Sequence, residues 1–266
     1  MTVPSQPHFA VVIPALNEER SIREVVRSAL AISTQVIVID DGSTDRTVER
    51  IQELPITLIH HAHPLGKGAG LRDGFRKAQE LGCTAVVSMD GDGQHLAADI
   101  PRLVAVAKLY PHHIIIGARI KDREQQPRGR RRANAVADWG ISAACGVAIA
   151  DTQSGQRYYP TEVLTLMNLE AEDFVFEAAL LIAACRELNM GVVSVPIASR
   201  YEGAFRSSHF RPVRDVTRIT LFTIGRILHY GNFLTYYRHS RKQAPIIVNP
   251  SLVTPSHTPD ELRSIG

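Results

Sequence analysis

The sequence places two carboxylates one residue apart, directly after a short apolar run. Val86–Met89 is followed by Asp90, Gly91, Asp92 and Gly93. Aspartate oxygens are hard ligands that suit Mg²⁺ or Mn²⁺ bridging phosphate groups. The two glycines let the backbone approach a ligand without a Cβ in the way. The pattern therefore predicts a site for a divalent cation and a phosphate, with a simple Asp-Gly turn that caps the next helix as the alternative.

Two further polar motifs follow apolar runs earlier in the chain. In Asp40–Asp45 a carboxylate could accept hydrogen bonds from a base or ribose, and another residue of this motif could cap the next helix. In Pro14–Glu19 the proline ends a strand and Asn17 can cap the following helix. Because crossovers of one hand bring the carboxyl ends of parallel strands to the same sheet edge, we expect all three motifs to border one crevice.

A glycine-rich segment, Pro64–Gly74, has the composition of a phosphate loop but not the spacing of one. No glycine stands five residues before Gly66, and neither Ser nor Thr follows Lys67, so the Walker pattern fails. The third glycine of a dinucleotide fingerprint is replaced by Leu71 or Asp73, depending on the register. The segment therefore does not support the interpretation of this protein as a P-loop hydrolase or as a dehydrogenase.

These motifs are carried by short apolar runs that alternate with segments of helical spacing. The runs are rich in Val and Ile and end in polar residues or glycine, as buried parallel strands do. Helices are expected between them, including Ala69–Leu81, Asn134–Cys145 and Phe174–Leu188. The alternation predicts an α/β fold with a mostly parallel central sheet and helices on both faces. The predicted strands are Phe9–Ala15, Gln35–Asp40, Ile56–His61, Thr84–Met89, His113–Gly117 and Val192–Ile197.

Composition is that of an ordinary globular protein, with 44% apolar and 21% charged residues among 266. The net charge of +3 is too small to imply nucleic acid as a partner. Three scattered cysteines match no metal or redox spacing and suit a reducing cytosol, and no signal peptide is apparent. The most apolar late segment, Ile219–Tyr237, contains Arg226, His229 and Asn232, which disfavour a membrane-spanning helix.

The chain divides into three regions by composition. Residues 1–208 hold the predicted α/β domain, which includes a polar loop at 119–132 with seven basic residues. Residues 209–243 are basic and apolar together, which predicts an amphipathic helical segment that lies in a membrane interface, on the protein's own core or in a dimer contact. Residues 244–266 carry four prolines and little apolar patterning, which predicts a disordered tail.

Taken together, the ordered motifs resemble the family 2 glycosyltransferases with the GT-A nucleotide-diphospho-sugar transferase fold. Within that family the sequence is most similar to polyprenyl-phosphate glycosyltransferases such as dolichyl-phosphate mannose synthase. The resemblance covers roughly residues 9–215. It rests on Pro14–Glu18, Asp40–Ser43, Gly66–Gly68, Asp90–His95 and Gly117–Arg119.

The resemblance implies roles for individual residues. The expected nucleotide-sugar contacts are Pro14, Asn17, Glu18, Asp41, Lys67, Asp90, Gly91, Arg119 and Arg157. The expected ligands of Mg²⁺ or Mn²⁺ are Asp90, Asp92 and Gln94. The expected catalytic residues are Asp92, Arg200 and Arg206. Two positions depart from the family pattern, since Gln156 stands where an aromatic residue is usual and Arg206 replaces a lysine.

The same resemblance implies metal-dependent transfer of a hexose, with inversion, from a GDP- or UDP-linked sugar to a lipid-linked acceptor, with polyprenyl phosphate expected. A divalent metal would stabilise the charge of the leaving diphosphate, and arginines would add charge-assisted hydrogen bonds. The enzyme is then expected to be cytoplasmic and peripheral on the inner face of the membrane, with a homodimer as an open possibility.

The acceptor chemistry stays open at this point. A phosphate acceptor is already anionic, whereas a sugar or lipid hydroxyl in envelope glycoconjugate synthesis needs a general base. The nearest candidate bases in motif order are Glu172, Asp173 and Glu177, although Glu177 stands among apolar helical residues and fits a structural role better.

Two other classes remain as alternatives. A sugar nucleotidyltransferase also combines an α/β sheet with nucleotide and metal, but such enzymes usually carry a glycine-rich loop after the first strand, and Pro14–Glu19 contains no glycine. A catalytically inactive nucleotide-sugar-binding or scaffolding protein would keep the fold without turnover. Intact Asp90, Asp92 and Gln94 count against that reading.

Overall fold

A computed structural model describes residues 8–120, 128–169, 173, 175–198, 212–231, 238 and 242–250. Side chains are described for these residues except at 128–133 and 212–216. The described residues form one sheet of eight strands in the order β3-β2-β1-β4-β6-β5-β7-β8. Strand β6 runs antiparallel to both of its neighbours, and the other pairings are parallel. The expectation of a mostly parallel central sheet is therefore confirmed.

The strands and helices have the following bounds. The strands are β1 Phe9–Ala15, β2 Val36–Asp40, β3 Thr57–His60, β4 Ala85–Ser88, β5 His113–Ala118, β6 Arg157–Pro160, β7 Gly191–Pro196 and β8 Ile246–Ile247. The α-helices are α1 Ile22–Leu30, α2 Thr47–Ile51, α3 Lys67–Glu80, α4 Ile100–Leu109, α5 Arg128–Cys145, α6 Val175–Glu187 and α7 Pro212–Tyr230. The described residues also form two 3₁₀ segments, η1 Ala97–Asp99 and η3 Thr161–Leu166.

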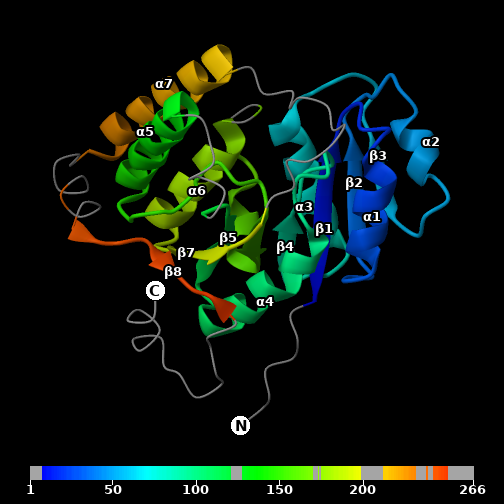
Figure 1. The fold of residues 1–266 in the computed structure, drawn as a ribbon, viewed down its shortest axis with the longest axis horizontal. Helices are drawn as coiled ribbons and strands as arrows, with labels where there is room; N and C mark the ends of the chain where they lie inside the picture. Colours follow the sequence, from blue (N-terminus) through cyan, green and yellow to red (C-terminus); the bar gives the residue numbers. More distant parts are fainter. Residues whose placement is uncertain are drawn as a thin grey trace, which may run out of the picture.

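Helices cover both faces of the sheet. Alternate residues of β1 divide between two apolar clusters: Ala10 and Val12 join α3, α5 and α6, whereas Val11 and Ile13 join α1 and α4. This alternation is the period-2 pattern of a strand buried on both sides. In Figure 1, α1 and α2 lie beside β1–β3, and α5, α6 and α7 gather at the other end of the sheet, near β5 and β7. The predicted α/β layering is thus observed.

Each predicted strand lies within one residue of its expected bounds, but two elements differ from expectation. Strand β6 was not expected, because Arg157–Pro160 opens with an arginine and ends with a proline and so lacks the apolar run of its neighbours. Helix α5 begins at Arg128, inside the stretch that was expected to be a polar loop up to residue 132. Arginine is a good helix former, so a basic run is compatible with this earlier helix start.

The expected disordered tail is wrong for its first residues. Ile246 and Ile247 form β8, in parallel register with Val193 and Ser194 of β7. Val248 beside them is buried. This short strand pairs the outer edge of β7, whose backbone groups would otherwise lack partners, and it adds apolar cover. Residues 251–266 lie outside the described residues.

Helix α7 occupies much of the region 209–243 and packs on α5 and α6. Ile219 and Thr223 face inward and are buried, whereas Leu221, Ile224 and Leu228 are exposed. Among the described helices, none combines the length and the apolar character that crossing a bilayer requires.

Helix α3 approaches the sheet closely through glycine. A Cβ on Gly74 would lie 2.5 Å from Cγ1 of Val12 and 2.7 Å from Cδ1 of Ile39, both buried strand residues. Because Val12 is β-branched and fully buried, it has little room to rotate away. The close approach fixes the position of α3 and of Lys67 at its first turn relative to the strand ends.

We expect Gly74→Ala to lower the free energy of unfolding by about 1–3 kcal/mol, because the added methyl overpacks the contact between α3 and the sheet. Urea denaturation followed by circular dichroism measures the change. Gly225→Ala in α7 is the matched control, since no heavy atom lies within 4 Å of its added Cβ. It should leave stability unchanged or raise it by up to about 1 kcal/mol. Equal stability for the two variants would contradict the close packing of α3.

Candidate active site

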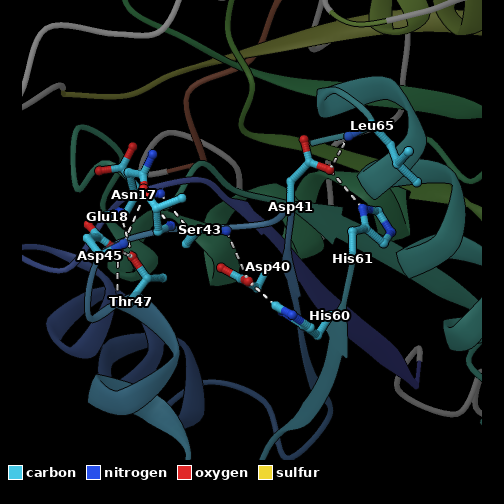
Figure 2. Close-up of polar contacts among 11 residues, drawn as sticks. Asn17, Glu18, Asp40, Asp41, Ser43, Asp45, Thr47, His60, His61 and Leu65 are labelled. Carbon is cyan, nitrogen blue, oxygen red and sulfur yellow. Dashed lines mark hydrogen bonds and ion pairs between the residues drawn. The ribbon is translucent and has the colours of Figure 1, made fainter. Parts of the chain in front are cut away.

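The ends of β1 and β2 are tied together by hydrogen bonds between the loops that follow them (Figure 2). The Asn17 side-chain oxygen accepts from the backbone N–H of Thr44 at 2.8 Å, and the Asn17 N–H donates to Ser43 Oγ at 2.8 Å. The Glu18 N–H donates to Thr47 Oγ1 at 2.7 Å. Asn17 adopts a positive φ of 55° to make these contacts, so it organises the neighbouring loop rather than capping α1 as expected.

Asp41 ties β2 to the start of α3. Its two carboxylate oxygens accept from the backbone N–H groups of Leu65 and Gly66, both at 2.8 Å. The His61 ring lies 2.7 Å from Asp41 and 3.1 Å from Asp73, so it bridges two carboxylates. Figure 2 shows Asp41 between Leu65 and His61. In the described structure Asp41 therefore holds the loop in front of α3, and its contact with a nucleotide stays a prediction.

Lys67, Asp90 and Glu177 form a largely buried ion cluster. Lys67 Nζ lies 2.7 Å from Asp90 Oδ1 and 2.9 Å from Glu177 Oε2. Burial by itself would lower the pKa of Lys67, but the two carboxylates raise it above its usual value. Burial by itself would raise the pKa of Asp90, but Lys67 lowers it to about 2. The cluster thus keeps Asp90 ionised. Its inclusion of Glu177 was missed from sequence, where no spacing relates residue 177 to residue 67.

Asp92 and Glu18 add two further carboxyl groups to the same region. Asp92 Oδ1 accepts from the backbone N–H of Gln94 at 2.9 Å. Burial and the charge of Asp90 raise the pKa of Asp92 to about 6. Burial and the charge of Asp92 raise the pKa of Glu18 to about 7. These shifts mark a region that concentrates negative charge and would gain stability from a bound cation.

The donor set fits a divalent cation that is shared with phosphates. Among the described residues, no group of three or more His, Cys, Asp or Glu side chains could enclose a metal ion. Mg²⁺ and similar ions are usually held by one or two carboxylates together with substrate phosphates. Asp90 and Asp92 supply two such carboxylates at the end of β4, so the protein offers a partial coordination sphere that a diphosphate could complete.

The backbone around Asp90 is packed by glycines and a buried histidine. A Cβ on Gly91 would lie 3.2 Å from the carbonyl oxygen of Pro14, and one on Gly155 would lie 2.5 Å from Asp90 Oδ2. His95 Nδ1 lies 3.5 Å from the same Asp90 oxygen, and burial lowers the His95 pKa to about 4. The first strand end, the paired aspartates and the loop before β6 therefore meet at one place, as the expectation of a common crevice requires.

Arg119 forms a bidentate pair with Asp151. Its Nε and Nη2 lie 2.8 Å and 2.9 Å from the two carboxylate oxygens, and its backbone N–H donates to Asp151 at 2.9 Å. Such forked pairs are among the strongest charged hydrogen bonds. Asp151 has a positive φ of 57° and precedes Thr152, which is held by Asp138 on α5. The pair positions Arg119 beside the strand ends, and its contact with a donor stays a prediction.

Arg157 does not line the site, although it was expected to bind the donor. The side chain is 1% exposed and donates to the carbonyl oxygens of Ser154 and Thr152, each at 2.7 Å, and of Glu177 at 3.2 Å. A guanidinium enclosed by backbone carbonyls supports the site from behind, because no ligand can reach it. Gln156 is also buried and donates to the Leu96 carbonyl at 2.9 Å.

Three predicted functional residues cannot be placed. Arg200, Arg206 and Glu172 lie outside the described residues. The structure thus brings together Pro14, Asn17, Glu18 and the residues of the Asp90 motif, and it adds Glu177, Asp151 and His61 to the network. Their partners, Lys67 for Glu177, Arg119 for Asp151 and Asp41 for His61, lie in distant segments, and no local signal in the sequence identifies such pairs.

The family model for glycosyl transferase family 2 matches residues 10–169. This span contains the strand ends, the Lys67 loop, the paired aspartates and the Arg119–Asp151 pair. The chain belongs to glycosyl transferase family 2. It is therefore an enzyme of the glycosyltransferase class, as its resemblance to polyprenyl-phosphate glycosyltransferases implied.

Two curated relatives of this glycosyltransferase act on polyprenyl phosphates by name. The UDP-N-acetylglucosamine–dolichyl-phosphate N-acetylglucosaminyltransferase of Methanococcus voltae is 26% identical over 243 residues, which cover 82% of this chain and 97% of the relative. The polyprenol monophosphomannose synthase of Mycolicibacterium smegmatis is 30% identical over 212 residues, which cover 74% and 78%.

A solved structure with the same fold is glucosyl-3-phosphoglycerate synthase from Mycobacterium tuberculosis, in complex with Mn²⁺, uridine diphosphate and phosphoglyceric acid. The TM-score is 0.62 at 24% identity, and the match covers 84% of this chain and 78% of that one. The likeness confirms the expected GT-A fold.

The raised pKa of Glu18 predicts a pH-dependent stability. Its ordinary value is 4.5 and its folded value about 7, so between these the folded state holds a proton that the unfolded state releases. The contribution of Glu18 is therefore complete below pH 4.5 and is lost as the pH rises through 7. The side chain of Glu18→Gln stays neutral at every pH. We therefore expect the melting temperature of this variant, relative to that of the wild type, to rise progressively from pH 5 to pH 8. Thermal melts in EDTA measure this difference.

Glu49→Gln is the matched control, because Glu49 is exposed on α2. Its melting temperature relative to the wild type should stay constant over the same pH range. A constant difference for Glu18→Gln as well would show that Glu18 does not sit in the negative field of the paired aspartates.

Proposed function

We propose that this family 2 glycosyltransferase is a metal-dependent, inverting hexosyltransferase that uses a GDP- or UDP-linked sugar and a lipid-linked acceptor, with polyprenyl phosphate as that acceptor. The observation that carries the proposal is the pair Asp90 and Asp92 at the carboxyl end of β4, beside Glu18 and Lys67. Ligands of open α/β sheets bind at this edge. Its combination of clustered carboxylates and a buried lysine suits a diphosphate with its metal ion.

Asp90, Asp92 and Gln94 would hold Mg²⁺ or Mn²⁺. When bound, the ion supplies charge stabilisation to the leaving nucleoside diphosphate without transfer of a proton. The structurally similar glucosyl-3-phosphoglycerate synthase was solved with Mn²⁺ and uridine diphosphate, which supports this choice of ion and leaving group.

The remaining contacts to the donor come from the neighbouring strand ends. Pro14, Asn17 and Glu18 would border the nucleotide, with Asp41 as the anchor of the adjacent loop. Lys67 and Arg119 carry positive charge to the same edge, where charge-assisted hydrogen bonds to phosphate are strong. Arg200 and Arg206, by their resemblance to a family pair of basic residues, are assigned to the donor and acceptor phosphates.

The acceptor is better explained by a phosphate than by a hydroxyl. A hydroxyl acceptor needs a general base, and the described candidates are engaged in ion pairs: Asp173 with Arg218 at 2.7 Å, and Glu177 with Lys67 at 2.9 Å. A phosphate oxygen is already anionic and needs no base. The two relatives are by name a dolichyl-phosphate N-acetylglucosaminyltransferase and a polyprenol monophosphomannose synthase, which supports the same choice. Direct attack by this oxygen on the anomeric carbon gives inversion.

Transfer to a polyprenyl phosphate should require both Mn²⁺ and Asp92. We expect the wild type to transfer a radiolabelled hexose from its UDP- or GDP-linked donor into the organic phase, and we expect EDTA to abolish this transfer. Asp92→Asn should lower turnover by about 100-fold or more, since it removes a carboxylate ligand of the ion that stabilises the leaving diphosphate. Glu80→Gln, an exposed change at the end of α3, should keep wild-type turnover.

Full activity in EDTA or in Asp92→Asn would contradict the metal role. Turnover confined to glycolipids that offer only hydroxyl groups would contradict the phosphate acceptor. Release of pyrophosphate in place of nucleoside diphosphate would revive the nucleotidyltransferase alternative.

We also propose that α5 and α7 present the surface that contacts an anionic membrane. Leu221, Ile224 and Leu228 stand at helical spacing on α7 and are exposed, as is Trp139 of α5. Gly140 of α5 faces Thr223 of α7, so Trp139 and Ile224 each stand one residue from the contact between the two helices. Exposed apolar side chains on a helix with several arginines suit a headgroup interface. The α7 arginines in the sequence are Arg214, Arg218 and Arg226.

The double substitution Trp139→Glu and Leu228→Glu should weaken binding to vesicles of phosphatidylglycerol and phosphatidylcholine by about tenfold or more. Each change removes apolar area and adds a charge that anionic headgroups repel. Vesicle co-sedimentation measures the loss. Ala105→Glu combined with Lys108→Gln, at exposed positions of α4 on the other face of the sheet, changes the net charge by the same −2 and should bind normally.

Unchanged vesicle binding of the double variant would contradict this surface. If light scattering instead shows that the variant converts a dimer to a monomer while vesicle binding persists, the surface is a contact between two copies of the chain.

A further inference from the structure

Lys67 occupies the direction from which a cation would reach Asp90. Its ammonium lies 2.7 Å from Asp90 Oδ1. The other oxygen, Oδ2, is packed against Gly155, where an added Cβ would lie 2.5 Å away. The Nδ1 atom of His95 lies 3.5 Å from Oδ2. The Asp90 side chain is 27% exposed, and a metal ion that binds Oδ1 would compete with the Lys67 ammonium for this oxygen.

Glu177 is a second carboxylate partner of the Lys67 ammonium. Its Oε2 lies 2.9 Å from the ammonium, and its Oε1 is buried without a hydrogen-bond partner among the described residues. The Arg157 guanidinium holds the Glu177 backbone carbonyl at 3.2 Å, so α6 keeps this carboxylate in position. Glu177 thus has unused capacity to accept from the ammonium.

Among the described residues, one lysine is paired with both carboxylates of the cluster. Asp90 and Glu177 share the Lys67 ammonium, and buried carboxylates are costly without a partner of opposite charge. Arg119 is engaged in its bidentate pair with Asp151.

We propose that Lys67 is the internal counter-ion of Asp90 in the free enzyme, and that Glu177 is a positioning residue that receives the ammonium when metal and donor occupy Asp90. This inference rests on the metal site of the proposed function. A metal ion that binds without donor must displace the Lys67 ammonium from Asp90, and it brings no new hydrogen-bond acceptor for that ammonium. With a diphosphate present, the ammonium gains phosphate oxygens as partners. Metal and donor consequently bind together, each raising the affinity of the other, as linkage requires.

Mn²⁺ binding in the absence of donor tests this exchange directly. Titration followed by electron paramagnetic resonance should show about tenfold tighter Mn²⁺ binding in Lys67→Met, a typical size for a coupling between sites. Glu177→Gln should bind Mn²⁺ more weakly than the wild type, because the ammonium then rests on Asp90 alone. The two substitutions thus shift affinity in opposite directions, which a general loss of structure does not do.

Two further variants separate displacement from net charge. Lys77→Met removes an exposed lysine from the same helix, where it pairs with Glu80 at 2.9 Å, and should leave Mn²⁺ affinity unchanged. The double variant Lys67→Met with Glu177→Gln has the net charge of the wild type and should still bind Mn²⁺ more tightly than it. Because the double variant removes one buried carboxylate with the lysine, it also serves if Lys67→Met alone does not fold.

The outcomes distinguish this inference from the proposed function. Mn²⁺ affinity that is unchanged or weaker in the double variant overturns the counter-ion role of Lys67. Unchanged affinity in Glu177→Gln overturns the role of Glu177. If the wild type binds no Mn²⁺ even with UDP or GDP present, the proposed metal dependence itself is wrong. If the wild type binds Mn²⁺ with UDP or GDP, and their effect on Mn²⁺ affinity falls in the double variant, the exchange is supported.

Discussion

The concentration of partly buried carboxyl groups at one sheet edge is the constraint on which the rest of the structure depends. Asp90, Asp92 and Glu18 come from two different strand ends, and Glu177 comes from α6 on the face of the sheet. Without compensation their mutual repulsion would open this edge. Lys67 supplies the compensation within the protein, and it can do so only because α3 begins beside β4 and lies flat on β1 and β2. The close approach at Gly74 is thus a condition for the charge balance at Asp90.

Hydrogen bonds between loops turn separate strand ends into one rigid border. Asn17 joins the first loop to the second, and Asp41 joins the second to the Gly66 turn. His61 braces Asp41 from β3. Most of these bonds pair a side chain with a backbone N–H that would otherwise be unsatisfied near the end of a strand or the start of a helix. The loops therefore hold this edge of the sheet in place, which lowers the entropy cost of ordering it when a ligand binds.

A second buried polar network supports the opposite side of the site. Backbone carbonyl oxygens surround the Arg157 guanidinium, which therefore fixes both the loop before β6 and the start of α6. The Arg119–Asp151 pair and the Asp138–Thr152 bonds tie the same loop to β5 and α5. Buried charges of this kind must be fully satisfied, and the antiparallel insertion of β6 between β4 and β5 is what brings their partners within reach.

The sequence by itself determined the elements and the edge where chemistry occurs. Period-2 and period-3.6 apolar patterns are local, so β1 to β5, β7, α3 and α6 could be predicted within two residues, and polar motifs at strand ends located Asp90, Asp92 and Glu18. Only the tertiary structure decided which distant groups meet. The partnership of Lys67 with Glu177, the burial of Arg157, the insertion of β6 and the pairing of β8 all depend on contacts between segments far apart in the chain. The free energy of such contacts comes from burial and charge compensation in three dimensions, and no local pattern of residues encodes it.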